Sequence, residues 1–216
     1  MDALESGQLI VFEGIDGSGK STQARRICNR LTAGGISPVA TCEPTDGPIG
    51  TLIRKMLSGD VAVDQRTLAA LFAADRTDHL LNADNGIKAQ VDQGRVVVCD
   101  RYYFSSYAYH AQFMDMDQVI TLNQMNAQIL KPSVTLFIDV DPGLCLERIK
   151  SGRQSLDIYE KIDILESVRR HYFTAFERFG DTERVVIVDG NGSEEEVEER
   201  VWQHLCRAVS LPLTHE

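Results

Sequence analysis

The sequence lacks several features that would assign it to a specialised class of protein. It has no run of eighteen apolar residues, and its N-terminus has no basic region followed by an apolar stretch, so neither a membrane span nor a secretory signal is expected. Its five cysteines form no C-x-x-C pair and no cluster with histidine, so neither a zinc site nor a disulfide framework is expected. We therefore expect a cytoplasmic protein with reduced cysteines and no membrane partner.

Positive charge is scarce as well. The chain has 22 Lys and Arg against 32 Asp and Glu, a net charge of -10, and no stripe rich in Lys or Arg. Because such a chain repels nucleic-acid backbones, nucleic acid is not an expected partner. A small phosphorylated substrate remains compatible, since a few cations that converge in one cleft can bind it. With 216 residues, 43% hydrophobic and 25% charged, the chain has the length and composition of one globular domain.

Five apolar segments rich in β-forming residues alternate with segments of helical pattern. They cover residues 8–13, 37–42, 95–100, 134–140 and 184–190. Continuous apolar runs, such as Val96 to Val98, favour strands that are buried on both faces. Strands that alternate with helices predict an α/β fold in which helices cover a parallel sheet. The pattern also predicts a helix over 157–179 that ends at Gly180, and another that begins after Ser193 with a capping box to Glu196.

A glycine-rich stretch, VFEGIDGSGKSTQ, follows the first expected strand. Its pattern Gly14-x-x-x-x-Gly19-Lys20-Ser21 is that of a phosphate-binding loop between a strand and a helix. Glycines let the backbone point its N–H groups at an anion, while lysine and serine serve the phosphates and Mg²⁺. A glycine turn that only caps a helix is the alternative. We predict a nucleotide-binding loop made of Gly14, Ile15, Asp16, Gly17, Ser18, Gly19, Lys20, Ser21 and Thr22.

Two further segments carry charges suited to phosphoryl transfer. Asp100, at the end of a neighbouring strand, is placed to organise Mg²⁺ through water, and Arg101 beside it can span donor and acceptor phosphates. A salt bridge at the strand end is the alternative. Arg148, Lys150 and Arg153 surround a glycine just before a long helix. Such a basic segment can close over a transferring phosphoryl group, or it can be a solvated turn.

Five segments, in this order, carry a resemblance to a known family: FEGIDGSGKST, EPTDGPIGTLIR, LFAADRTDHL, DRYYFSSYAY and LERIKSGRQSLDIYE. Together they resemble the thymidylate kinases across nearly the whole chain. The resemblance implies a three-layer P-loop NTPase-type fold with a five-stranded parallel sheet of order 2-3-1-4-5. It further implies one domain over 1–216, a short lid at about 148–157, and a homodimer formed through helices that flank the acceptor site.

The resemblance also implies an activity and a set of site residues. The activity is Mg²⁺-dependent transfer of the γ-phosphoryl group of ATP to dTMP, which gives dTDP for dTTP synthesis. The catalytic groups that it implies are Lys20, Asp16, Arg101 and Arg153. The acceptor site that it implies contains Asp16, Glu43, Arg54, Phe72, Arg76, Arg101, Ser105, Ser106, Tyr109 and His110.

The family pattern gives most of these acceptor-site residues a role. Asp16 matches the acidic residue near the sugar 3′-hydroxyl, and Arg54 and Arg101 match the arginines that hold the acceptor phosphate, a task that suits guanidinium groups. Phe72 and Arg76 match the pair that stacks on thymine and hydrogen-bonds its O4. Ser105, Ser106 and Tyr109 match the segment that lines the base and the 2′ side of the sugar, where a tyrosine ring would crowd a ribose hydroxyl. Glu43 is given a supporting role only. Without the family match, Phe72 and Tyr109 would equally be core residues.

Some positions depart from the family pattern. Cys42 stands where many bacterial members have arginine, and His110 stands where a glutamine near the base is expected. His110 can donate or accept a hydrogen bond, or can simply be a buried histidine.

The lid differs from some family members as well. Gly17 follows Asp16 directly, so the glycine loop contributes no basic residue of its own and an arginine must come from the lid. We favour Arg153 over Arg148 for this role, and place Arg148 at the donor nucleotide. Glu160, at the junction of lid and helix, is expected near Mg²⁺.

Two alternatives remain at this stage. The first is a kinase of another nucleoside monophosphate or of a deoxynucleoside; a nucleoside acceptor needs a carboxylate base and makes less use of Arg54. The second is a nucleotide-binding sensor without turnover, which would have no use for the acceptor-site residues.

Overall fold

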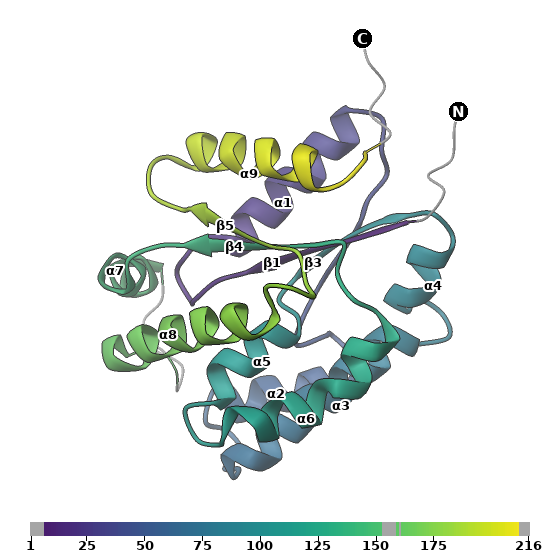
Figure 1. The fold of residues 1–216 in the computed structure, drawn as a ribbon. Coiled ribbons are helices and arrows are strands. Elements are labelled where there is room, and N and C mark those ends of the chain that lie inside the picture. Colours follow the sequence, from purple (N-terminus) through teal and green to yellow (C-terminus); the bar gives the residue numbers. More distant parts are fainter. Residues whose placement is uncertain (1–6, 153–158, 160, 212–216) are drawn as a thin grey trace.

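The structure is a computed structural model that describes residues 7–152, 159 and 161–211. In these ranges five strands form one parallel sheet of order β2-β3-β1-β4-β5, as predicted (Figure 1). The strands are β1 (Gln8–Glu13), β3 (Val96–Asp100), β4 (Val134–Asp139), and the edge strands β2 (Val39–Cys42) and β5 (Val185–Asp189). Each lies within the segment that the apolar runs indicate, and the three inner strands are buried on both faces.

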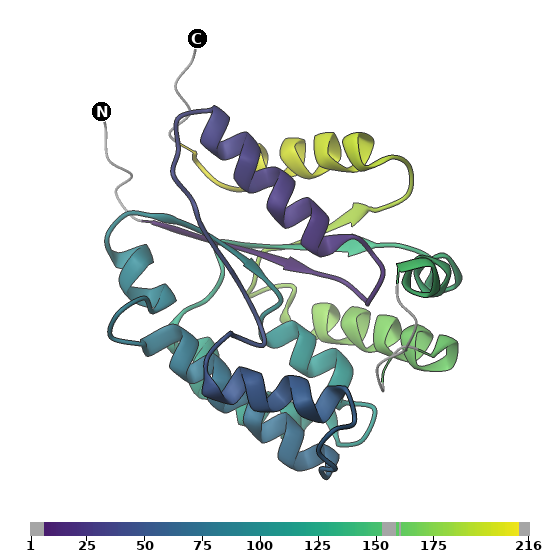
Figure 2. The same cartoon turned by 180° about the vertical axis from the view of Figure 1, so that it is seen from behind.

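Helices cover both faces of the sheet and make three layers. On one face lie α1 (Lys20–Ala33) and α9 (Glu194–Ala208), side by side in both views (Figures 1 and 2). On the other lie α5 (Tyr103–His110) and α8 (Ile162–Phe179), with further helices beyond them (Figure 1). The remaining helices are α2 (Pro48–Leu57), α3 (Gln65–Leu81), α4 (Ile87–Asp92), α6 (Met116–Ile129) and α7 (Pro142–Gly152).

The predicted end of α8 and the predicted start of α9 are confirmed. The predicted start of α8 at residue 157 is wrong, because the helix begins at Ile162 with Lys161 as its N-cap. Helix α8 ends at Phe179 with Gly180 as its cap. The Ser193 hydroxyl accepts from the Glu196 N–H at 3.2 Å, and the Glu196 carboxylate accepts from the Ser193 N–H at 2.9 Å, which is the expected capping box of α9. No helix in the described ranges combines the length and the apolar composition needed to cross a membrane.

The proposed lid is described only in part. Residues 148–152 form the last turn of α7, so Arg148 and Lys150 lie on a helix. Arg153 and Glu160 lie outside the described residues, and their predicted roles stay predictions.

Candidate active site

The glycine loop joins β1 to α1 at the carboxyl edge of the sheet. Gly17 has a left-handed φ of 81°, and a Cβ there would lie 2.4 Å from the carbonyl oxygen of Cys145, so glycine is required. Lys20 is the first residue of α1, is 6% exposed, and places its Nζ 3.5 Å from Asp16 Oδ1. Burial and the neighbouring charge of Arg101 lower the pKa of Lys20, while Asp16, Asp100 and Glu13 oppose that shift.

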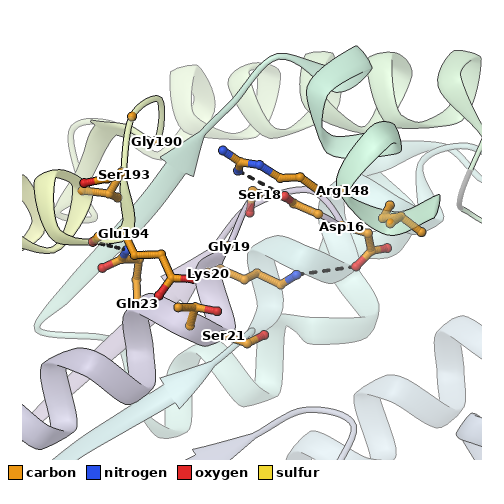
Figure 3. Close-up of a pocket in the computed structure, with 15 residues that line it drawn as sticks. Asp16, Ser18, Gly19, Lys20, Ser21, Gln23, Arg148, Gly190, Ser193 and Glu194 are labelled. Carbon is orange, nitrogen blue, oxygen red and sulfur yellow. Dashed lines mark hydrogen bonds and ion pairs between the residues drawn. The ribbon is translucent and has the colours of Figure 1, made fainter. Parts of the chain in front are cut away.

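A cavity of about 580 Å³ lies over this loop (Figure 3). One wall is residues 16–23, and the opposite wall comes from Arg148, Gly190, Gly192, Ser193, Glu194 and Val197. Gln23 Nε2 ties the two walls together by donating to the Glu194 carbonyl at 3.0 Å, and Arg148 Nη1 donates to the Gly17 carbonyl at 3.4 Å. Ser18 Oγ is buried in the loop without a hydrogen-bond partner among the described residues. The cavity thus combines the Ser18 hydroxyl, which has no partner among the described residues, with the buried cation of Lys20 at a helix N-terminus. Such an arrangement suits phosphate groups.

A second cavity, of about 110 Å³, lies on the other side of Asp16. Its lining is Asp16, Glu43, Pro44, Leu57, Phe72, Arg76, Arg101, Ser105, Ser106, Tyr109, His110 and Tyr159. All but one of the predicted acceptor residues are therefore brought together here. The exception is Arg54, which hydrogen-bonds to the Thr45 carbonyl and the Asp46 carboxylate.

Asp16 lines both cavities, and Arg101 lines the smaller one beside it. Arg101 Nη2 contacts Asp16 Oδ1, and the Tyr109 hydroxyl donates to Asp16 Oδ2 at 3.0 Å while accepting from the Asp16 N–H at 3.0 Å. Burial raises the pKa of Asp16, but the charges of Arg101 and Lys20 and the Tyr109 hydrogen bond outweigh it and hold that pKa at about 2. The carboxylate is therefore ionised and keeps two cations next to each other.

Arg76 lies at the floor of the second cavity and is 1% exposed. Its Nε donates to Glu43 Oε2 at 2.7 Å, Nη2 reaches Glu43 Oε2 and the Tyr102 carbonyl, and Nη1 donates to Ser106 Oγ and Asn123 Oδ1. All five N–H groups thus have protein partners, and a base oxygen would share one of them. Ser106 accepts from Arg76 and donates to no other described residue, which leaves its proton available to a ligand.

His110 faces the same cavity and is 2% exposed. Its ring centroid lies 5.2 Å from that of Phe72, and its Nδ1 is buried without a partner among the described residues. Burial and the charge of Arg76 lower the pKa of His110 to about 3, so the imidazole is neutral. A buried nitrogen without a partner is unusual, and it suits a hydrogen bond to a ligand.

Some residues around the site were missed by the sequence analysis. Glu13 is fully buried at the end of β1, and Tyr172 of α8 donates to its Oε2 at 2.8 Å. His79 bridges Thr41 Oγ1, at 2.6 Å, and Glu43 Oε1, at 3.1 Å. One signal could have identified Glu13, because a carboxylate directly after four buried apolar positions requires partners.

The residues predicted for Mg²⁺ are compatible with that ion, although the described residues include no cluster of three or more His, Cys, Asp or Glu that could hold a metal. Asp100 Oδ1 is buried and has no hydrogen-bond partner within those residues, which suits a metal-bound water. Ser21 lies in the first turn of α1, in the lining of the larger cavity.

Comparison with known proteins agrees with this geometry. The family model of thymidylate kinase matches residues 12–201. A putative thymidylate kinase of Treponema pallidum is 37% identical over 91% of this chain and 93% of its own length. A probable thymidylate kinase of Methanocaldococcus jannaschii is 37% identical over 94% of this chain and 97% of its own, and a thymidylate kinase of Bacillus licheniformis is 35% identical over 91% and 93%. The chain therefore belongs to the thymidylate kinase family and is a phosphotransferase.

Proposed function

We propose that the protein transfers the γ-phosphoryl group of Mg²⁺-bound ATP to the 5′-phosphate of dTMP, giving ADP and dTDP, the precursor of dTTP. The observation that carries the proposal is that two cavities share Asp16, which binds Lys20 of the larger cavity and Arg101 of the smaller one. The larger cavity suits the donor phosphates, because it contains the glycine loop and Lys20. The smaller cavity suits a stacked base and a sugar phosphate.

The carboxylates around the smaller cavity favour a phosphate acceptor over a hydroxyl acceptor. A hydroxyl would need a carboxylate base, whereas an acceptor phosphate is already a nucleophile at neutral pH. Glu13 accepts four hydrogen bonds, Glu43 is bound to Arg76 and His79, and Asp16 has a pKa of about 2. Because Glu13 and Glu43 already accept hydrogen bonds from several donors, and Asp16 with a pKa of about 2 is a weak base, none of the three suits the role of general base, and the deoxynucleoside alternative is disfavoured.

Catalysis in this proposal consists of alignment and charge neutralisation. Lys20 binds the β and γ phosphates of the donor, and Arg101 spans the transferring group and the acceptor phosphate. Arg153 supplies the arginine of the lid. Ser21, and Asp100 through a water molecule, would hold Mg²⁺, which offsets the negative charge of the donor phosphates when it is bound.

Base and sugar recognition follow from the lining of the smaller cavity. Phe72 stacks on the thymine, and the Ser106 proton and the neutral His110 ring supply hydrogen bonds to its polar edge. The Tyr109 ring lies on the side where a ribose would carry its 2′-hydroxyl.

We also propose that the protein is a cytoplasmic homodimer. Leu81 and Met125 are 54% and 55% exposed in an open groove between α3 and α6, close to the acceptor cavity. A second copy would cover this apolar surface. A mass of 24.1 kDa in solution at micromolar concentration would contradict the dimer.

The experiment that tests the function is ADP release from Mg-ATP with dTMP, dUMP, dCMP, AMP, GMP and thymidine as acceptors. We expect turnover to favour dTMP strongly. If another nucleotide is the preferred acceptor, the proposed phosphoryl transfer is retained, but the assignment of Phe72, Ser106 and His110 to thymine is wrong. If no acceptor reacts while ATP binds, the protein is a sensor and the proposal is wrong.

A further inference from the structure

The buried carboxylate of Glu13 contacts neither cavity, yet it binds the segment that carries Arg101. Its Oε1 accepts from the N–H groups of Tyr102, at 2.9 Å, and Ser105, at 3.1 Å. These are the N-cap and N3 positions of α5, whose N-cap residue makes no side-chain cap of its own. Glu13 therefore caps α5 from a neighbouring strand. Burial raises the pKa of Glu13, whereas the hydrogen bonds from Ser105 and Tyr172 and the charge of Arg101 lower it, and four donors at the positive end of that helix favour the ionised carboxylate.

The second carboxylate oxygen is linked to the Arg101 side chain. Ser105 donates its only hydroxyl proton to Glu13 Oε2 at 2.5 Å, and its oxygen accepts from Arg101 Nη1 at 3.1 Å. Tyr172 donates to the same Oε2 at 2.8 Å. The Ser105 and Tyr172 hydroxyls lie 2.9 Å apart, and Glu13 Oε2 is the acceptor that both share. With the Ser105 proton on the carboxylate, the serine lone pairs face the guanidinium.

The backbone at Arg101 needs such support. Its φ of 73° is the only left-handed φ of a non-glycine residue in the described ranges, and this conformation costs about 1–2 kcal/mol. The Arg101 N–H donates to the Phe12 carbonyl at 2.8 Å, and the next N–H, of Tyr102, donates to Glu13. Two consecutive residues of β1 thus hold the two peptide groups on either side of the Arg101 Cα, as expected where strain persists at a functional residue.

We propose that Glu13 is a positioning residue for phosphoryl transfer, because it fixes both the backbone and, through Ser105, the guanidinium of Arg101 beside Asp16 in the smaller cavity. The inference rests on the proposed function, which gives Arg101 its contact with the phosphates. It assigns Ser105 to the support of Arg101, since the serine hydroxyl has its proton on Glu13 and is not available to donate to a sugar or a base.

The test compares Glu13→Gln with the wild type and with a matched pair of tyrosine variants. Glutamine keeps the shape but removes the charge, and its NH₂ group reverses the hydrogen bond to Ser105. Tyr172→Phe removes a donor from Glu13. Tyr103→Phe is the control, because it also removes a buried hydroxyl that donates to a carboxylate, that of Glu183, away from both cavities.

The first readout does not depend on any acceptor. Guanidinium N–H signals of Arg101, assigned by their loss in Arg101→Lys, report by NMR whether the side chain is held. We expect these signals in the wild type and in Tyr103→Phe, weakened signals in Tyr172→Phe, and none in Glu13→Gln. Equal signals in folded Glu13→Gln would overturn the proposal, even if dTMP proves not to be the acceptor.

The second readout is kinetic. We expect Glu13→Gln to lower kcat about 10- to 100-fold, with the KM for ATP changed less than about twofold. In an Arg101→Ala background the same change should alter the residual kcat less than about twofold, because Glu13 acts through Arg101. An equal loss in both backgrounds would show a general structural role instead. If Glu13→Gln does not fold, Ser105→Ala takes its place in both measurements, with a loss of about tenfold expected only when Arg101 is present.

Discussion

Replacing Tyr109 by phenylalanine separates two roles of this side chain. The hydroxyl accepts from the Asp16 N–H, donates to Asp16 Oδ2 and accepts from Arg101 Nη2 at 3.3 Å. Removal of the Tyr109 hydroxyl leaves the partly buried Asp16 N–H without a partner and deprives the Asp16 carboxylate of a hydrogen bond. We expect the variant to keep the shape of the cavity and to lose the orientation of Asp16 and Arg101.

The size of the effect follows from these contacts. A buried donor without a partner costs about 1–3 kcal/mol, and a hydrogen bond to a charged group contributes about 1.5–3 kcal/mol. The N–H and the carboxylate that lose a hydrogen bond both belong to Asp16, so the two energies are not fully additive. We expect a total loss of about 3 kcal/mol in the free energy of unfolding. For a chain of this length that corresponds to a decrease in Tm of about 6–12 °C. The kcat should fall about 10- to 100-fold.

The assay measures Tm together with kcat/KM for dTMP and for the corresponding ribonucleotide. The Tyr109→Phe variant should keep the preference for the deoxy sugar, since its aromatic ring remains in place. The Tyr109→Ala variant should lose that preference. Loss of the Tyr109 hydrogen bond raises the pKa of Asp16 from about 2, but the charges of Arg101 and Lys20 keep it well below 7. A phenylalanine variant that melts like the wild type but accepts ribonucleotides would refute this reasoning.

Further changes test other parts of the site. Lys20→Met should lower the rate of ADP release at least about 100-fold. Its melting temperature should stay close to that of the wild type, because Arg101 still pairs with Asp16. A near-normal rate would exclude Lys20 from catalysis. Arg54→Ala should raise the KM for dTMP about tenfold and leave kcat unchanged, and an unchanged KM would favour a nucleoside acceptor. Burial and the charge of Arg76 hold the pKa of His110 in the folded protein at about 3, below the usual 6.5. On acidification the unfolded state therefore binds the proton first, and the free energy of unfolding falls as the pH drops from about 6.5 towards 3. Between pH 7.5 and 5 this loss is about 2 kcal/mol, and urea titrations should show that His110→Gln abolishes it; an equal loss in the variant would mean that His110 is not the titrating group.

The sheet and the glycine loop could be predicted because their signals are local. Runs such as Val96 to Val98 fill both faces of a strand, and Gly17 is required by its own backbone angle. The capping box of α9 is local as well, since it joins residues three positions apart. Each of these features depends on residues that are close in the sequence.

The contacts between distant segments could not be predicted in the same way. Tyr172 reaches Glu13 across 159 positions because α8 packs against the sheet, and no periodicity specifies which polar side chains then meet. The far wall of the donor cavity comes from α7, from the loop before α9 and from the first turn of α9, and of these residues only Arg148 was expected at the donor nucleotide. Arg54 of α2 is bound to Asp46 in the loop before that helix, and the spacing of eight positions does not specify this ion pair.

The charges of the site explain how an acidic protein can hold two phosphorylated substrates. Lys20 and Arg101 are close enough for each to oppose the charge of the other, and burial lowers the pKa of Lys20 further. Asp16 lies between them, contacts both, and stays ionised because of them. Without ligands the carboxylate therefore keeps both cations charged and in place, and the phosphates of a bound nucleotide add a second set of counter-charges. The positions of Lys20, Arg101 and Asp16 at this site, rather than the net charge of -10, therefore decide which anions the protein binds.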